Sequence, residues 1–361
     1  MKPAVAVPAI SALVYRAYSR KSLTPVGILV AFATAIAHTV HPWSVFFALL
    51  AVFFLAGTTV TKVKHDIKAK LTQSASGATG GEGPRNHIQV LANTLVASIL
   101  ILLHLYTIRN DGSYWNKDLC FKRGSDVLVV GIVANYVAVA ADTFSSELGI
   151  LSKTKPRLIT APWRIVPPGT NGGVTLTGLG AGLLGSFILS ATSALLLPFC
   201  KDWTLDKKAQ YTAALTFAGF TGTLLDSLLG ALFQASVIDI HSGKVVEGEG
   251  GRKVLVHGKS ALRFKPTADL RSMAGTHGES QDDVAKTSAL AGALGARTMQ
   301  RAGASGTNVP DQQHESRRIE VGKDVLDNNA VNILMAALVS LGSMVVAAYV
   351  WEVPLSGIVS I

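Results

Sequence analysis

The chain has 361 residues, of which 49% are hydrophobic and 16% are charged, and its mean hydropathy is +0.37. Soluble domains carry about 25% charged residues, so this composition excludes an ordinary soluble protein and indicates a polytopic membrane protein. The formal net charge of +10 does not indicate a nucleic-acid partner, because basic residues beside a bilayer usually set membrane topology.

Eight apolar stretches approach the ~20 residues that a helix needs to cross a bilayer. In chain order they are residues 2–15, 25–40, 43–61, 90–108, 125–144, 172–199, 211–233 and 330–351. The first could be the core of a signal peptide, but Tyr15-Arg16-Ala17-Tyr18 is a poor cleavage site, which favours a retained anchor. The sequence therefore predicts an all-α fold, a polytopic membrane helix bundle with about eight transmembrane spans.

The basic residues predict the orientation of this bundle. With eight spans, the loops at 16–24, 62–89, 145–171 and 234–329 share one side, and they hold most of the Lys and Arg residues. The positive-inside rule makes that side cytoplasmic. We expect the endoplasmic reticulum or another endomembrane in preference to the plasma membrane.

One long segment differs from the rest of the chain. Residues 258–322 are poor in large apolar side chains and rich in Ala, Gly, Ser and Gln, so they cannot bury enough surface to offset the entropy of ordering. We predict a disordered cytoplasmic insert there. Residues 1–257 and 323–361 are predicted to form a single transmembrane domain.

Two short patterns are given no role in binding. Cys120 and Cys200 are the only cysteines, and without metal-ligand spacing they predict neither a disulfide scaffold nor a zinc site. "GAGLLG" at 180–185 matches a dinucleotide-binding pattern, but no strand precedes it. Gly178, Gly182 and Gly185 are interpreted as small residues that let a neighbouring helix approach closely.

Three acidic residues lie in or beside predicted spans: Asp142 and Glu147 in "VAVAADTFSSELGIL", and Asp226 in "GTLLDSLLGALFQ". Carboxylates at membrane depth are costly unless they are paired or hydrated, so they mark candidate functional sites. The alternatives are a headgroup position for the first two residues and a structural ion pair for Asp226. We predict that all three act in catalysis and bind a metal ion.

A cluster of polar residues opens the last predicted span in "KDVLDNNAVNIL". Any one of them could be an ordinary helix N-cap, but four exceed what capping requires. Asp327 is therefore predicted to bind metal, and Asn328, Asn329 and Asn332 to bind substrate.

Further substrate-binding candidates come from three blocks. "TKVKHDIKAK" supplies Lys62 and Lys64, whose alternative role is snorkelling beside the membrane. "RNHIQVLAN" supplies Gln89 and Asn93. "VPPGTNGGVT" supplies Thr170, Asn171, Gly172 and Gly173, which are interpreted either as a capped turn before a helix near Val174 or as backbone N–H donors to a phosphate.

All these blocks fall on the same predicted side of the membrane, although they come from different spans. Lysines, carboxylates and a Gly-rich helix start on one face suit an anionic, metal-bound phosphate ligand.

The blocks also resemble a known family. "RKSLTPVG", "TKVKHDIKAKL", "RNHIQVLAN", "ADTFSSELG", "SKTKPRLIT", "VPPGTNGGVT", "LLDSLLGA" and "LDNNAVN" occur in the order typical of the transmembrane protein 19 family, domain of unknown function 92. The resemblance spans about residues 16–352 apart from the insert. The family's acidic block usually reads Asp-x-Trp-Ala-Ser-Glu, whereas Phe144 and Ser145 replace its Trp and Ala here.

The resemblance implies a function, because the family includes a plant plastid phytyl-phosphate kinase and is distantly similar to CTP-using dolichol and phytol kinases. It implies phosphoryl transfer from a nucleotide, CTP or ATP, to an isoprenoid lipid phosphate at the cytoplasmic face. We predict Mg²⁺ as the cofactor, held by the carboxylates. The expected partners are membrane lipid, a lipid phosphate and a nucleotide. Two alternatives stay open: a transporter or cation-coupled carrier, and a non-catalytic scaffold that acts through the 258–322 loop.

Overall fold

A computed structural model describes residues 1–75, 80, 83–116, 118–122, 126–254, 256 and 317–353. Most of the predicted insert lies outside these residues. Its last part does not, because Arg317–Val321 form a strand, β7.

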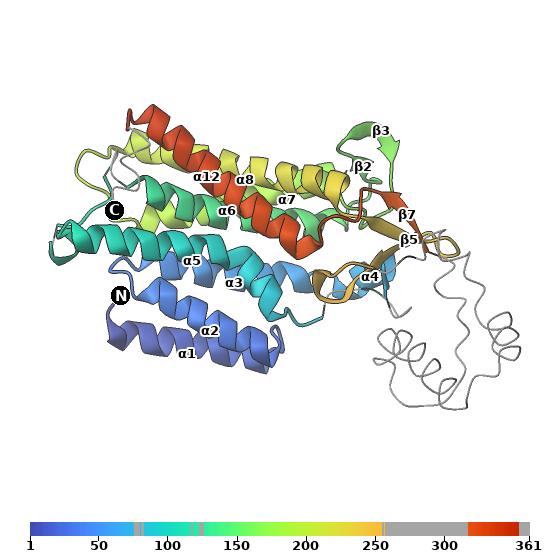
Figure 1. The fold of residues 1–361 in the computed structure, drawn as a ribbon, viewed down its shortest axis with the longest axis horizontal. Helices are drawn as coiled ribbons and strands as arrows, with labels where there is room; N and C mark the ends of the chain where they lie inside the picture. The colour runs from blue at the N-terminus through green and yellow to red at the C-terminus, as the bar shows by residue number, and fades with distance from the viewer. Residues whose placement is uncertain are drawn as a thin grey trace, which may run out of the picture. The chain divides into compact units, whose positions relative to one another are not determined.

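Helices occupy all eight stretches that the sequence predicts as spans (Figure 1). They are α1 (Pro3–Ser19), α2 (Pro25–Thr39), α3 (Val45–Lys62), α5 (His87–Asn110), α6 (Val127–Gly149), α7 (Leu176–Leu196), α8 (Leu205–Phe233) and α12 (Asn328–Val350). Within the described residues, the last six of these are long and apolar enough to cross a membrane. Helix α2 is apolar but has only 15 residues, which rise about 22 Å against the ~30 Å of a bilayer core.

Helix α6 is the centre of the bundle. It packs against α3, α5, α7, α8 and α12, and its residues from Val127 to Ala141 are all buried. A helix that is apolar all round is expected to be enclosed in this way. Polar links fix it to its neighbours: Asn135 Nδ2 donates to the carbonyl of Asn93 at 3.0 Å, and Tyr136 Oη lies 2.5 Å from His38 Nε2. These contacts set the position of Asp142 near the far end of α6.

Small residues let α7 pack closely on α6, as the sequence predicts. A Cβ atom on Gly182 would lie 3.1 Å from the carbonyl oxygen of Ala141, and one on Gly185 would lie 2.7 Å from Cγ of Phe144. Glycine at these positions therefore permits a backbone separation that a larger residue would increase.

Gly185→Ala is expected to destabilise the protein by about 1–3 kcal/mol, because the added methyl group overpacks the α6–α7 contact. Thermal unfolding of the detergent-solubilised protein measures this loss. Gly180→Ala is the matched control, because a Cβ atom there meets nothing within 4 Å. Equal melting temperatures for the two variants would contradict this account of the packing.

One end of the bundle carries two small sheets and a short helix that the sequence analysis did not predict. The sheets have strand orders β1-β6-β5-β7 and β3-β2-β4, and the short helix is α4 (His65–Leu71). The remaining strands are β1 (Gln73–Ser74), β2 (Arg157–Leu158), β3 (Ala161–Ile165), β4 (Gly173–Val174), β5 (Ser236–Asp239) and β6 (Val245–Glu247). The predicted helical membrane fold is confirmed, and these strands add a cap of connections to it.

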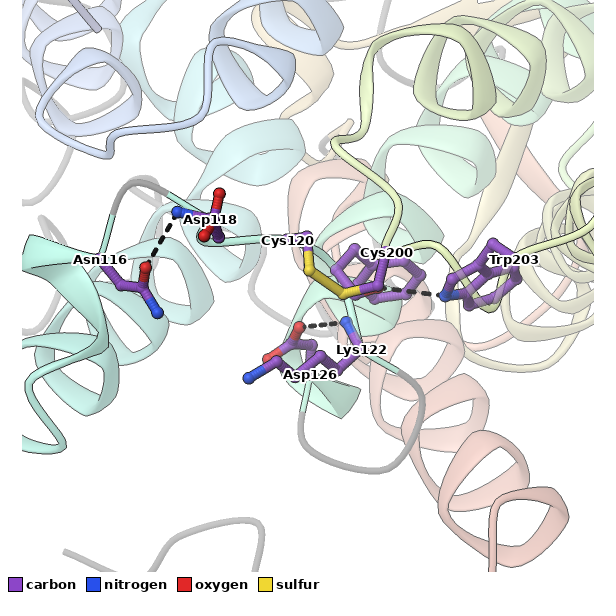
Figure 2. The surroundings of a disulfide bond; sticks show 8 residues. Asn116, Asp118, Cys120, Lys122, Asp126, Cys200 and Trp203 are labelled. Atoms are coloured by element: carbon purple, nitrogen blue, oxygen red, sulfur yellow. Dashed lines mark hydrogen bonds between the residues drawn. A yellow bond between two sulfur atoms is a disulfide. The ribbon is translucent and has the colours of Figure 1, made fainter.

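The other end of the bundle is held by a disulfide bond between Cys120 and Cys200, so the expectation that the two cysteines form no disulfide scaffold is wrong (Figure 2). Cys120 precedes α6 and Cys200 follows α7, and the backbone joins the same two segments. The amide of Phe121 donates to the carbonyl of Pro198 at 2.7 Å, and Trp203 Nε1 donates to the carbonyl of Phe121 at 3.1 Å. Pairing across 80 residues leaves no spacing pattern in the sequence.

Replacing both cysteines by serine is expected to lower the free energy of unfolding by about 2–4 kcal/mol, because the bridge restricts the unfolded chain. A lower melting temperature measures this effect. In the unmodified protein, a maleimide reagent should label no cysteine until a reductant is added. Labelling of the unreduced, unfolded protein would show that the bridge does not form.

Candidate functional site

A polar cavity of about 280 Å³ opens at the sheet-bearing end of the bundle. The ends of α3, α6 and α8 and the starts of α5, α7 and α12 meet there. Most of the residues predicted to form a site line it: Gln89, Asn93, Asp142, Glu147, Thr170, Asn171, Gly172, Gly173, Asp226, Asn328, Asn329 and Asn332. The fold thus brings together polar blocks that lie far apart in the sequence, while their roles stay predictions. We name this space the polar cavity.

Two carboxyl groups form the centre of the polar cavity. Asp142 from α6 and Asp226 from α8 lie within hydrogen-bonding contact of each other. With its amide nitrogen turned toward these acceptors, Asn332 of α12 donates to Asp226 Oδ1 at 3.2 Å. Two carboxylates so close repel each other unless a proton or a cation lies between them. The pair therefore provides a site for positive charge.

Glu147 lies elsewhere in the cavity wall and is paired with Lys68 of α4. The Lys68 ammonium also donates to the carbonyls of Val60 at 3.2 Å and Thr61 at 2.6 Å, and both charged side chains are nearly buried. Glu147 therefore anchors α4 to α6. In the described part of the chain, no three Asp, Glu, His or Cys side chains are grouped to hold a metal ion, so the predicted four-carboxylate set does not form.

Arg85 supplies a cation that the sequence analysis did not assign to the site. Its backbone pairs with the segment before α2, where the amide of Thr24 donates to the Arg85 carbonyl at 3.0 Å. Its guanidinium donates to Thr61 Oγ1 at 3.3 Å and forms no ion pair with any described residue. The positive charge of Arg85 is thus available to an anionic ligand. The sequence held a signal for this role, because Arg85 lies directly before the polar start of α5.

Lys62 and Lys64 do not line the polar cavity. The prediction that they bind a ligand in this cavity is therefore corrected. Lys62 ends α3, and Lys64 adopts a left-handed backbone with φ of 47° before α4 begins. Both side chains are exposed. This turn redirects the chain so that Lys68 reaches the cavity in their place.

The glycine-rich turn lines the cavity, but three of its backbone amides are already used. The amides of Thr170, Asn171 and Gly173 donate to Pro167 O, Ser236 Oγ and Thr170 O at 3.2, 2.8 and 2.9 Å. These three N–H groups are therefore occupied within the protein, and phosphate binding by the turn stays a prediction. Gly172 has φ of +77°, and a Cβ atom there would lie 2.4 Å from Cβ of Ala231 in α8.

Helix starts around the cavity are capped differently from the prediction. Helix α7 is capped by Thr175, whose Oγ1 accepts from Gly178 N at 3.0 Å, and not by Thr170 or Asn171. Asp327 caps α12 by accepting from Ala330 N at 2.8 Å. Asp327 does not line the polar cavity but lines the adjoining cavity described below, and its predicted role as a metal ligand stays a prediction.

Asn329 is the polar residue of this cluster with an unmet hydrogen bond. Its side chain is 2% exposed, and Nδ2 donates to the carbonyl of Gly250 at 3.0 Å. Its Oδ1 is buried and accepts no hydrogen bond from the described residues. Because an unsatisfied buried acceptor is costly, this atom indicates a ligand or ion at the site.

A second polar cavity of about 370 Å³ adjoins the first. We name it the loop cavity, because the glycine-rich residues 248–251 and the basic residues Arg252 and Lys253 line it. Gly250 and Gly251 have positive φ values of 65° and 77°. The two cavities share Gln89, Asn171 and Asn328 in their walls, so ligands bound in both would lie next to each other.

Comparisons with known proteins identify relatives of this chain. The family described as integral membrane protein DUF92 matches residues 8–340. Protein PGR of Arabidopsis thaliana is 36% identical over 247 residues, which cover 66% of this chain and 82% of that protein. An uncharacterised membrane protein of Methanocaldococcus jannaschii is 33% identical over 186 residues, 52% of this chain and 64% of the relative.

A third relative, the chloroplastic protein VTE6 of Arabidopsis thaliana, is 28% identical over 212 residues, which cover 55% of this chain and 56% of that protein. No solved structure matches the chain. The family match extends over most of the chain and includes the helices that line the polar cavity. The chain therefore belongs to the DUF92 family and is an integral, multi-pass membrane protein.

Proposed function

We propose that this protein transfers a phosphoryl group from a nucleoside triphosphate to an isoprenoid lipid phosphate. The observation that carries the proposal is the polar cavity, where the Asp142–Asp226 pair and Arg85, which forms no ion pair with the described residues, lie together at one end of a membrane helix bundle. The resemblance to a family that contains a phytyl-phosphate kinase supports the same chemistry.

The reaction needs positioning and charge neutralisation more than covalent help from the protein. An oxygen of the lipid phosphate attacks the γ-phosphorus of the nucleotide, and the bond from that phosphorus to the bridging β–γ oxygen breaks. The nucleoside diphosphate leaves, and the lipid diphosphate forms. In this proposal Arg85 binds and orients the lipid phosphate through charge-assisted hydrogen bonds.

The donor set around the carboxyl pair fits Mg²⁺, which proteins usually hold through one or two carboxylates together with substrate phosphates. Asp142 and Asp226 would hold the ion, and the buried Oδ1 of Asn329 offers a further oxygen nearby. When bound, Mg²⁺ neutralises the charge on the transferred phosphoryl group. Asn332 keeps the Asp226 carboxylate oriented through its amide.

The nucleotide is assigned to the loop cavity. Gly250 and Gly251 let the backbone turn tightly beside Asn329, and Arg252, which is exposed, adds positive charge. Turns with successive glycines commonly bind phosphates through backbone N–H groups. A triphosphate placed there would extend into the polar cavity across the shared wall.

Purified full-length protein, incubated with phytyl or farnesyl monophosphate, CTP or ATP and Mg²⁺, should form the lipid diphosphate, detected by mass spectrometry. Farnesol, which lacks the phosphate, should give no product. Absence of product with every lipid phosphate would overturn the proposal. Transport of labelled lipid phosphate into proteoliposomes without nucleotide would support the carrier alternative instead.

A further inference from the structure

A third cavity, apolar and about 70 Å³ in volume, lies among α1, α2, α3 and α5. Leu13, Ala31, Phe53 and Phe54 are among the side chains that line it. We name it the apolar groove. The hydroxyls of Thr58 and Thr94 also reach its wall, but they donate to carbonyls of their own helices at 3.1 and 2.9 Å. Apart from Thr34, Arg85, Gln89 and Asn93, the rest of the groove therefore presents a hydrocarbon environment.

The apolar groove meets the polar cavity at three residues. Arg85, Gln89 and Asn93 line both spaces. The carboxamide side chains of Gln89 and Asn93 lie one helical turn apart on α5. Arg85 brings a positive charge to this junction that no described carboxylate neutralises. A molecule that spans the junction would place an anionic group at Arg85 and an apolar chain in the groove.

The helices that form the groove also border the lipid. On α2, the large apolar residues Leu29 and Phe32 are 67% and 45% exposed, while Ala31 and Ala35 of the same helix line the groove. Exposed apolar side chains of this size on a membrane protein face hydrocarbon. Helix α2 thus has one side on the groove and another toward the surrounding lipid.

We propose that the apolar groove binds the hydrocarbon chain of a single-chain lipid phosphate whose phosphate group lies at Arg85. This inference rests on the proposed function and names the position of its acceptor substrate. A narrow groove suits one isoprenoid or alkyl chain and not the two chains of a bilayer phospholipid. Burial of each methylene contributes about fourfold in affinity, so the groove would select long-chain acceptors over short ones.

Photo-crosslinking tests this position without requiring turnover. The probe is a farnesyl monophosphate analogue with a diazirine on its terminal isoprene unit, applied to the full-length protein in nanodiscs. The label should appear on peptides from α1, α2 and α3, and unlabelled farnesyl monophosphate should compete while inorganic phosphate should not. Labelling confined to other helices would overturn the proposal.

Filling the groove provides a second test. Ala31→Phe should reduce labelling at least about tenfold and raise the KM for farnesyl monophosphate, with little change for a five-carbon prenyl phosphate. Ala33→Phe is the matched control, because Ala33 lies on the same helix, is exposed and does not line the groove. Equal labelling of the two variants would overturn the proposal. If Ala31→Phe does not fold, labelling of the unmodified protein still decides the question.

The two hypotheses fail in different ways. If the unmodified protein is labelled in the groove but forms no diphosphate, the binding site stands and the phosphotransferase function is wrong. If diphosphate forms while the label lies elsewhere, the function stands and the chain position is wrong.

Discussion

Asp226→Asn is expected to lower kcat for lipid diphosphate formation by about 100-fold or more. The substitution keeps the size of the side chain but removes one of the two carboxyl groups that face each other at the centre of the polar cavity. The remaining carboxylate of Asp142 would then hold a divalent cation alone, and the transferred phosphoryl group would lose much of its charge neutralisation. Initial rates at saturating lipid phosphate, measured across a Mg²⁺ titration, check this result.

The control for this prediction is Asp206→Asn. Asp206 lies in the first turn of the same helix, at the opposite end from the cavity, and is exposed. Its substitution should leave both kcat and the Mg²⁺ dependence unchanged. Full activity of Asp226→Asn, with a normal melting temperature, would remove the carboxyl pair from the proposed mechanism.

Arg85→Gln should raise the KM for the lipid phosphate by about 10- to 100-fold. Charge-assisted hydrogen bonds contribute about 1.5–3 kcal/mol, and glutamine retains a donor to Thr61 but not the charge. Arg85→Lys should recover part of this loss, because an ammonium restores the charge without the paired donors of guanidinium. Steady-state kinetics with farnesyl monophosphate at saturating nucleotide provide the measurement.

Arg20→Gln serves as the comparison for Arg85→Gln. Arg20 lies just after α1, in the segment that leads to the strand-like pairing of Leu23 with Arg85, and its side chain is exposed. The Arg20→Gln substitution removes one positive charge near the same end of the bundle, as Arg85→Gln does, but at a residue that does not line the polar cavity. A KM that rises equally in both variants would indicate a general effect of surface charge, and would count against phosphate binding by Arg85.

The helix bundle could be predicted from the sequence because its signal is local. Apolar runs of helical length mark each span, and the polar blocks at their ends indicate which ends meet. That reasoning placed Asp142, Asp226 and Asn332 near one face, and the structure brings them into one cavity. The direction in which each side chain points around its helix could not be predicted. Asp142 and Glu147 lie in the same helix, yet only Asp142 lies beside Asp226, while Glu147 is paired with Lys68.

The errors have specific physical causes. The left-handed backbone at Lys64 interrupts the helical register between α3 and α4, so spacing alone favours the wrong lysines. The β5–β6 hairpin left a signal in "SVIDIHSGKVVE", where β-branched residues flank a Ser-Gly turn. The cysteines also left a signal, because both lie in loops assigned to the same side of the membrane. The use of the turn's amides within the protein, by contrast, could be recognised only from three-dimensional contacts.

The bridge between Cys120 and Cys200 distinguishes the two ends of the bundle by the redox state of the compartment that each one faces. It joins the start of α6 to the end of α7, whereas Asp142 and Arg85 lie at the opposite end of the bundle. Disulfides persist in oxidising compartments and are reduced elsewhere. In a membrane that divides an oxidising from a reducing space, the polar cavity would therefore open toward the reducing space. The distribution of Lys and Arg independently points the same way, so cysteine labelling from each side of sealed vesicles, after reduction of the bridge, would show which aqueous phase the bridge faces and which the polar cavity faces.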